Sequence, residues 1–303
     1  MCRECRMPEL LFPLDSAKKF NEQHIIGHNR WHPDIPPVVT VKRGDTFRAH
    51  CREWFDGAIH NDDSAEDILN APLQNVHCLS GPFAVDGAEP GDLLIVDILD
   101  LGPIPQEDSG PLAGQGWGYT GIFAKRNGGG FLTDQFPDAY KAIWDFAGQT
   151  ATSRHIPGVK YTGIVHPGLM GTAPSAQLLA KWNRREGALI ATDPDRVPPL
   201  ALPPEPDGAI LGALTGDEFA RVAAEAARTA PPAKTAATRT SRTSPKVPGC
   251  FIRCSCPAPT CRSAICTSPG RRRDHFLRRH RNGWLHRRSC GRDQRGHADL
   301  RRL

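Results

Sequence analysis

The chain has 303 residues, of which 39% are hydrophobic and 23% are charged, and its formal net charge is +5. That charge is the sum of two unlike parts. Residues 233–303 hold 18 Lys and Arg against 3 Asp and Glu, a net +15, whereas residues 1–232 hold 20 against 30, a net −10. Because an acidic body repels nucleic acid and anionic membranes, we expect neither as a partner.

Targeting signals are not evident in the sequence. No apolar run approaches the roughly 20 residues that a membrane-spanning helix needs. No apolar segment follows the charged N-terminus, which excludes a secretory signal, and Met7 suggests that residues 1–6 are a mis-assigned extension. Four cysteines in residues 1–232 call for no disulfide framework. We therefore expect a cytoplasmic protein.

Short apolar runs separated by turn residues dominate residues 7–232. Val38–Val41 and Thr46–Cys51 flank a Gly-Asp turn, and a second Gly-Asp turn precedes the buried-type run Leu93–Leu99. These units predict a mainly β fold, a distorted sandwich or barrel built from hairpins. Capping residues and helical spacing predict a few short helices, at Asp63–Leu69, Ser175–Glu186 and Asp217–Arg228.

Two polar clusters are candidates for chemistry. His28, His32 and Asp34 precede the first predicted strand, and imidazole and carboxylate are the usual ligands of zinc and similar ions. The alternative is a polar loop held by hydrogen bonds.

The second cluster follows His60. Asn61 and Asp62 are candidate metal ligands, and the adjacent carboxylates of Asp62 and Asp63 are candidates for catalysis because neighbouring acids can share a proton or bind a cation. The alternative is a helix N-cap cluster. His166, beside turn residues, is a third catalytic candidate. Asn127–Phe131 is glycine-rich but lacks the strand and helix of a nucleotide loop, so no organic cofactor is expected.

Long strings in residues 28–204 resemble the formamidase/acetamidase family. They include HNRWHPDIPPVVTVKRGD at 28–45, NDDSAEDI at 61–68, VHCLSGPFAVDGAEPGDLLIVDILD at 76–100, WGYTGIFAKRNGGGFLTDQFP at 117–137, AIWDF at 142–146, SRHIPGVKYTGIVHPGLMGTAPS at 153–175 and KWNRREGALIATDPDRVPPLALPP at 181–204. The WGYTGIFAKRNGGGFLTD string is similar to the formamidase branch in particular.

The resemblance implies a β-rich fold and hydrolysis of a small linear amide, with formamide the expected substrate. It also implies a homo-oligomer and a divalent metal, zinc or calcium, that would polarise the amide carbonyl and activate water. The clusters at His28–Asp34 and Asn61–Asp63 are the expected sources of its ligands.

The resemblance ends near Pro232. When residues 270–277 are written in GC-rich codons and read one base later, they give G-D-G-E-I-T-F-C, a string similar to the family's second half. When residues 234–247 and 250–267 are written in codons in the same way but read from a different starting base, they also give strings similar to the family's second half. We infer base insertions or deletions near Pro232 and Pro269, and we expect residues 233–303 to be unstructured and the chain to be inactive.

An alternative interpretation makes the tail functional. Cys261, Cys266, His275 and His280 beside Arg271–Arg273 have some likeness to a zinc finger with a basic patch. The spacing is shorter than in such fingers and no apolar finger core is evident. This interpretation predicts a non-catalytic metal- or ligand-binding protein with a nucleic-acid-binding tail.

Overall fold

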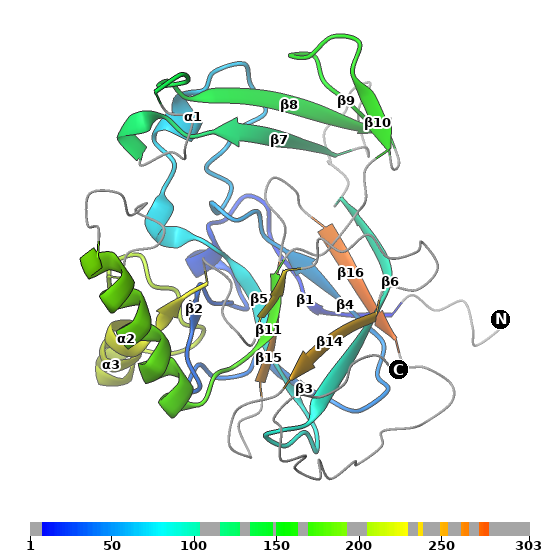
Figure 1. The fold of residues 1–303 in the computed structure, drawn as a ribbon. Coiled ribbons are helices and arrows are strands. Elements are labelled where there is room, and N and C mark those ends of the chain that lie inside the picture. Colours follow the sequence, from blue (N-terminus) through cyan, green and yellow to red (C-terminus); the bar gives the residue numbers. More distant parts are fainter. Residues whose placement is uncertain are drawn as a thin grey trace, which may run out of the picture.

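The computed structural model describes residues 8–103, 116–127, 134–147, 150–162, 169–192, 205–229, 236–238, 249–253, 262–266 and 273–278 (Figure 1). Two five-stranded sheets form the body. In the first, the strand order is β1-β4-β16-β6-β14. Its strands are β1 (Glu9–Phe12), β4 (Phe47–Cys51), β6 (Leu93–Pro103), β14 (Gly249–Arg253) and β16 (Arg273–Arg278).

The second sheet has the order β13-β11-β15-β5-β3. Its strands are β3 (Val39–Val41), β5 (Leu79–Val85), β11 (Leu169–Thr172), β13 (Ala236–Thr238) and β15 (Arg262–Cys266). The two sheets share one apolar core, to which the first contributes Phe12, Phe47 and Ile98 and the second contributes Phe83 and Met170. The predicted mainly β, sandwich-like fold is confirmed.

The two Gly-Asp turns carry the chain from one sheet to the other. Gly44 and Gly91 each have φ of 94°, a conformation that glycine adopts without strain. The first turn joins β3 of the second sheet to β4 of the first, and the other joins β5 to β6 in the same way. The prediction of hairpins at these turns is therefore wrong, because each pair of strands is divided between two layers.

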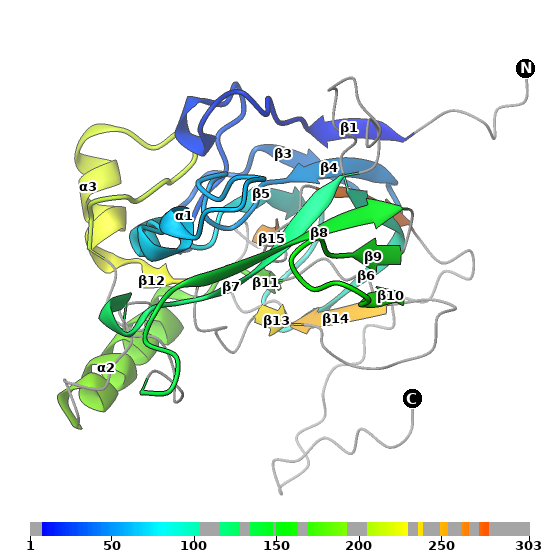
Figure 2. The same cartoon turned by 90° about the horizontal axis from the view of Figure 1, so that it is seen from above.

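A separate four-stranded antiparallel sheet lies at one end of the body (Figures 1 and 2). Its order is β10-β9-β8-β7, and its strands are β7 (Trp117–Ile122), β8 (Tyr140–Ala147), β9 (Thr150–Thr152) and β10 (Lys160–Thr162). Helix α1 (Glu66–Leu69) lies beside β7 and β8 in Figure 1. This arrangement brings the segment from His60 to Leu69 against the small sheet.

The other helices cover the opposite end. The predicted helices are confirmed as α2 (Ala176–Thr192) and α3 (Gly216–Glu225), and the Ser175 hydroxyl caps α2 by accepting the Leu178 N–H at 3.2 Å. They pack beside the ribbon of β2 (Arg30–Trp31) and β12 (Ala227–Arg228). Short 3₁₀ turns are η2 (Phe20–Glu22), η3 (Leu73–Asn75) and η4 (Lys125–Asn127).

Four strands fall in the segment 233–303 that we expected to be unstructured. β13 pairs with β11, β14 with β6, β15 with β5 and β11, and β16 with β4 and β6. β15 lies between β11 and β5 and β16 lies between β4 and β6, and the expectation that residues 233–303 as a whole are unstructured stays a prediction. The other tail residues lie outside the described part, as do residues 1–6.

Among the described residues, no helix has the length and apolar character needed to cross a lipid bilayer.

Candidate functional site

The loop between β4 and α1 is held in place by a buried carboxylate. One Glu53 oxygen accepts the N–H groups of Phe55 and Gly57 at 3.0 and 2.9 Å, and the other accepts the Tyr119 hydroxyl at 2.6 Å. The Trp54 indole donates to the same hydroxyl at 2.8 Å. Burial raises the pKa of Glu53 and of Tyr119 above their usual values. This network fixes the start of the loop that carries Asn61–Asp63.

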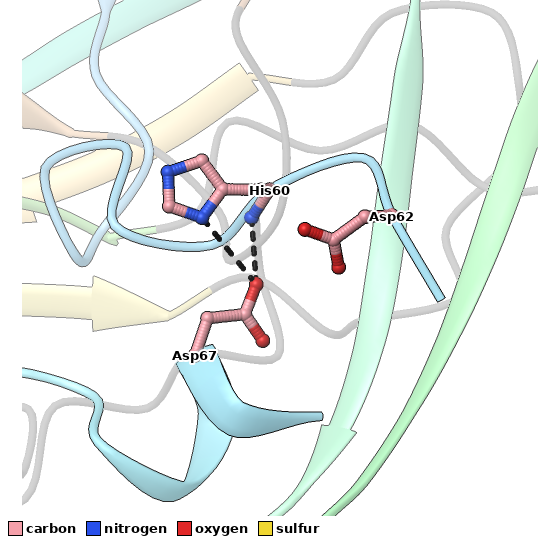
Figure 3. A group of neighbouring side chains, drawn as sticks. All are labelled: His60, Asp62 and Asp67. Carbon is pink, nitrogen blue, oxygen red and sulfur yellow. Dashed lines mark hydrogen bonds and ion pairs between the residues drawn. The ribbon is translucent and has the colours of Figure 1, made fainter. Parts of the chain in front are cut away.

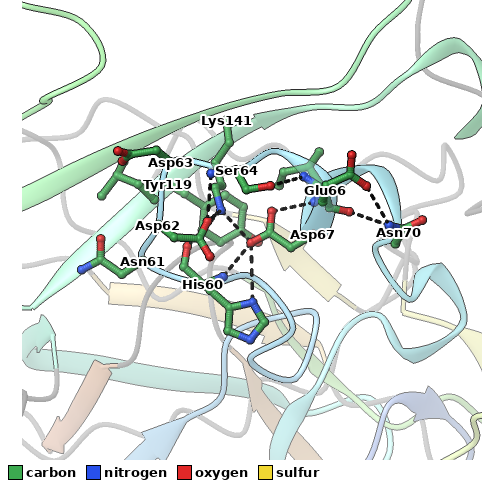
Figure 4. Close-up of polar contacts among 12 residues, drawn as sticks. His60, Asn61, Asp62, Asp63, Ser64, Glu66, Asp67, Asn70, Tyr119 and Lys141 are labelled. Carbon is green, nitrogen blue, oxygen red and sulfur yellow. Dashed lines mark hydrogen bonds and ion pairs between the residues drawn. The ribbon is translucent and has the colours of Figure 1, made fainter.

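Lys141 of β8 lies between two carboxylates of that loop and of α1 (Figure 4). Its Nζ is 2.6 Å from Asp62 Oδ1 and 2.7 Å from Asp67 Oδ2, and it donates to the His60 carbonyl at 3.1 Å. The lysine side chain is 1% exposed, Asp67 is 10% exposed and Asp62 is 54% exposed. The hydrogen bond from Lys141 lowers the pKa of Asp62. A buried ammonium therefore keeps a half-exposed carboxylate ionised.

Gly121 makes this geometry sterically feasible. It lies opposite Lys141 in the β7–β8 register, and a Cβ there would lie 2.7 Å from Ile68 Cδ1. Because Gly121 has no side chain, Ile68 of α1 packs directly on β7 and is fully buried. Asp67, its neighbour in sequence, is thereby placed against Lys141.

Asp63 and Asn61 have partners after β9. Arg154 donates to Asp63 Oδ1 at 3.1 Å and to Asn61 Oδ1 at 2.8 Å. His155 accepts the Ile143 N–H at Nδ1, which leaves the proton on Nε2, and Nε2 donates to Asp63 Oδ1 at 3.1 Å. Asp63 is 80% exposed. The structure therefore brings together three predicted residues, Asn61, Asp62 and Asp63, against β8 and the segment that follows β9.

Part of this cluster also organises the start of α1. Asp62 accepts the Ser64 N–H at 3.1 Å, and the Ser64 hydroxyl accepts the Glu66 N–H at 3.2 Å. These contacts are turns ahead of the helix, and the capping alternative is wrong for them, because the N-cap position of α1 is Ala65 and no side chain caps it. The helix begins at Glu66 rather than Asp63 because the preceding residues form these turns.

His32 and Asp34 lie elsewhere, beside α3. His32 Nδ1 accepts the Asp34 N–H at 3.1 Å and Nε2 is 3.2 Å from Glu225 Oε2, while Asp34 pairs with Arg221 at 2.8 Å. Burial lowers the pKa of His32. The side chains of His32 and Asp34 are thus already engaged in hydrogen bonds and ion pairs with α3 and with each other. The predicted ligands His28, His32 and Asp34 share no described contact with Asn61 and Asp62.

His28 has a different environment. Its Nδ1 donates to the Arg30 carbonyl at 2.7 Å, and its buried Nε2 has no hydrogen-bond partner among the described residues. Burial lowers the pKa of His28 to about 4, so the ring is neutral. A neutral imidazole with one nitrogen fixed by a backbone carbonyl is the form in which histidine binds metals. His166 lies outside the described residues.

The described residues offer one group with the ligand types of a metal centre, namely His60, Asp62 and Asp67 (Figure 3). One ligand atom from each lies within 4.8 Å of the others, and His60 Nδ1 is 3.8 Å from Asp67 Oδ2. The ammonium of Lys141 already lies where these two carboxylates would hold a cation. A metal ion does not fit the group in this arrangement, because it would have to displace the lysine.

Sequence reasoning missed Asp67, Lys141, Arg154 and His155. Asp67, Arg154 and His155 lie inside strings that carry the family resemblance, at 61–68 and 153–175, so those strings were the available signal. Lys141 directly precedes the string AIWDF, and only the folded structure shows that its Nζ lies 2.7 Å from Asp67 Oδ2.

The sequence profile of the Acetamidase/Formamidase family matches residues 13–240, and the chain belongs to that family. The chain is 65% identical over 226 residues to an acetamidase of Mycolicibacterium smegmatis and 58% identical over 219 residues to a formamidase of Methylophilus methylotrophus. These matches cover 75% and 72% of this chain but 55% and 52% of the relatives. The chain thus spans about half the length of the curated relatives it matches.

A solved structure of a gamma lactamase from Delftia acidovorans has the same fold, with a TM-score of 0.78 and 41% identity. The likeness covers 89% of this chain and 67% of the lactamase. The share of this chain covered by the structural likeness is larger than the share covered by the family match to residues 13–240.

Proposed function

We propose that the complete enzyme hydrolyses small linear amides to a carboxylate and ammonia, with formamide as the preferred substrate. The observation that carries this proposal is membership of the family over residues 13–240, with relatives named acetamidase and formamidase. The preference for formamide rests on the string WGYTGIFAKRNGGGFLTD at 117–134, which is similar to the formamidase branch.

Amide hydrolysis requires a base that takes a proton from water, and Asp62 is our candidate. Its carboxylate is half-exposed and ionised, so water reaches it in the form that accepts a proton. The water oxygen attacks the amide carbon, the carbon–nitrogen bond breaks, and the proton passes to the leaving nitrogen. Lys141, at 1% exposure, does not meet substrate and acts as a positioning residue for Asp62.

Asp63 and His155 form a second polar pair beside this base. His155 Nε2 carries a proton toward Asp63, at 3.1 Å, and the imidazole is 23% exposed. We propose that His155 holds the Asp63 carboxylate in position, and that this exposed carboxylate orients the amide by accepting its N–H group. His166 remains a candidate proton donor to the leaving nitrogen.

A divalent ion, zinc or calcium, remains a prediction for which His28 is the best-placed of the proposed ligands. Elemental analysis of the purified chain, with and without prior dialysis against a chelator, tests it. Stoichiometric metal that a His28→Gln variant loses would support the prediction, whereas equal metal content in both would refute His28 as a ligand.

We propose that the chain of 303 residues is inactive by itself, because it spans about half of its relatives. Ammonia release from formamide and acetamide by the purified chain tests this directly. Full turnover by the chain alone would refute it. A chain supplied with the rest of the fold should release ammonia, and formamide should give the higher kcat/KM.

We further propose a cytoplasmic homo-oligomer that does not bind nucleic acid specifically. Light scattering measures the assembly, and a gel shift with unrelated duplexes measures binding by the tail. Because any binding by a net +15 segment is electrostatic, it should vanish as salt rises and show no sequence preference. A salt-resistant, sequence-dependent shift would favour the zinc-finger interpretation instead.

A further inference from the structure

Arg154 binds both sequence neighbours of the candidate base. Its Nε donates to Asp63 Oδ1 at 3.1 Å and its Nη2 donates to Asn61 Oδ1 at 2.8 Å, so the guanidinium bridges the two residues that flank Asp62. Figure 4 shows Asn61, Asp62 and Asp63 next to one another on their loop. Because the donors of a guanidinium form a rigid fork, two hydrogen bonds fix its plane. Arg154 is therefore held in one orientation at this loop.

More than half of the guanidinium N–H groups remain available. A guanidinium has five N–H donors, and the bonds to Asn61 and Asp63 use two of them. The other three have no partner among the described residues, and the Arg154 side chain is 39% exposed. Arg154 can therefore donate hydrogen bonds to a molecule that arrives from solvent.

The other basic side chains that bond this loop have no N–H group to spare. Lys141 is 1% exposed, and its ammonium donates to three oxygen atoms of the loop and of α1. The Nε2 proton of His155 is directed at Asp63. Among the described side chains that bond Asn61, Asp62 or Asp63, Arg154 is thus the one with donors open to substrate.

The carboxylates beside Arg154 each keep one open oxygen. The hydrogen bonds that Asp62 and Asp63 accept all end on their Oδ1 atoms. Neither Oδ2 has a partner in the described part of the chain, and the side chains are 54% and 80% exposed. The ion pair of Arg154 and Asp63 therefore offers open donors beside an open acceptor. An amide presents the complementary groups, a carbonyl oxygen and an N–H on two bonded atoms.

We propose that Arg154 is a catalytic residue that binds the amide carbonyl oxygen and stabilises the negative charge that forms on it. This role rests on the proposed function, with Asp62 as the base and Asp63 as the acceptor of the amide N–H. Donors that are fixed before the reaction stabilise such an oxyanion more strongly than they stabilise the neutral carbonyl.

The reaction balances with these groups. The water oxygen bonds to the amide carbon, Asp62 takes one water proton, and the carbonyl electron pair moves onto the oxygen that faces Arg154. The carbonyl then re-forms and the carbon–nitrogen bond breaks. The nitrogen takes up the proton removed from water and leaves as ammonia, and the carbon is left as the carboxylic acid.

Kinetics of Arg154 variants test the proposal. The full chain is produced together with the part of the M. smegmatis acetamidase that follows its matched region, and ammonia release from formamide is measured. Arg154→Ala should lose about a hundredfold to a thousandfold in kcat with little change in KM, because an oxyanion donor acts in the transition state. The matched control is Arg126→Ala, which removes an exposed guanidinium that contacts Asn70 instead, and it should match the parent.

Two further readouts separate this role from that of holding the loop. Guanidinium chloride, at concentrations too low to denature the complex, should restore part of kcat to Arg154→Ala and none to Asp62→Asn. The pH at which kcat/KM rises should be the same in Arg154→Ala as in the parent, because Lys141 is the main cause of the lowered pKa of Asp62.

The outcomes also separate this role from the proposed function. A kcat for Arg154→Ala within about tenfold of the parent, or an equal loss in Arg126→Ala, overturns the role of Arg154 alone. A loss of kcat with a shifted pH dependence and no rescue by guanidinium shows that Arg154 only holds the loop. A parent complex that assembles but releases no ammonia refutes the proposed function and this role together. If Arg154→Ala does not fold, judged by circular dichroism, Arg154→Gln keeps a polar side chain and should show the same loss.

Discussion

Lys141 Nζ lies 2.7 Å from Asp67 Oδ2, with the lysine 1% exposed and the aspartate 10% exposed. Two opposite charges are thus held out of water between β8 and α1. Such a pair stabilises a fold weakly, but the loss of one partner leaves an uncompensated buried charge. The pair therefore fixes the position of α1 and of the Asp62 loop on the small sheet.

Replacement of Lys141 should test this directly. Lys141→Met leaves Asp67 as an unpaired carboxylate, and we expect a loss of about 3–5 kcal/mol in the free energy of unfolding, measured in urea. The double variant Lys141→Met/Asp67→Asn removes both charges and should recover a large part of that loss. If the double variant loses as much free energy of unfolding as Lys141→Met and Asp67→Asn lose together when measured singly, the two side chains do not interact and the expectation is contradicted.

Gly27 should tolerate no side chain. A Cβ there would overlap the Leu79 carbonyl oxygen and the Phe20 ring, and backbone atoms cannot rotate away. Gly27→Ala should therefore lower the free energy of unfolding by about 1–3 kcal/mol or more. The matched control is Gly187→Ala in α2, where nothing lies within 4 Å. It should raise stability by up to about 1 kcal/mol because alanine favours helix. If Gly27→Ala and Gly187→Ala change the free energy of unfolding equally, Gly27 is not packed against Leu79 and Phe20 as described.

Stability should fall as the pH is lowered from 6.5 toward 4. Burial lowers the pKa of His28 and of His77 to about 4, so the unfolded chain binds protons in this window while the folded chain does not. Each histidine should thus reduce the free energy of unfolding by about 1.4 kcal/mol per pH unit below 6.5 and have no effect above it.

A His77 variant isolates this contribution. His77 stacks on Trp54 with ring centroids 5.1 Å apart, so His77→Phe keeps an aromatic ring there and removes the titrating group. The dependence of stability on pH between 4 and 6.5 should become shallower in this variant. An unchanged slope in urea unfolding at pH 5, 6 and 7 would show that His77 is not buried as a neutral ring.

The coding DNA tests the origin of the tail. We expect the family's second half to be readable in neighbouring frames, with base insertions or deletions near codons 232 and 269. Sequencing from about codon 225 onward decides the point. A DNA sequence with no such strings in any frame would show that the tail is an ordinary part of this chain.

Much of the architecture was predictable because it depends on local signals. Turn glycines, β-branched runs and helical spacing predicted the strands at Thr46–Cys51 and Leu93–Leu99 and the helices at Ser175–Glu186 and Asp217–Arg228, which the structure has as β4, β6, α2 and α3. The assignment of strands to sheets was not predictable, because it depends on crossings at Gly44 and Gly91 that no local pattern encodes.

The part of the candidate site that is contiguous in the sequence was predictable, and the part contributed by distant residues was not. Asn61, Asp62 and Asp63 stand together in the sequence, so their common location was evident. Lys141 is far from them in sequence, and its contact with Asp62 and Asp67 depends on the register of β8 against β7 and on the space left at Gly121. Such long-range charge pairs follow from packing, which the pattern of residues alone does not specify.

Ammonia release from formamide is the most direct test of the central claim, that residues 13–240 carry an amidase site at Asp62. The full chain should be assayed together with the second half of the M. smegmatis acetamidase, in parent and Asp62→Asn forms. We predict ammonia and formate from the parent complex and a loss of at least about a hundredfold in kcat from the variant, with unchanged complex formation. Equal turnover by the two complexes, or none by the parent once assembled, would contradict it.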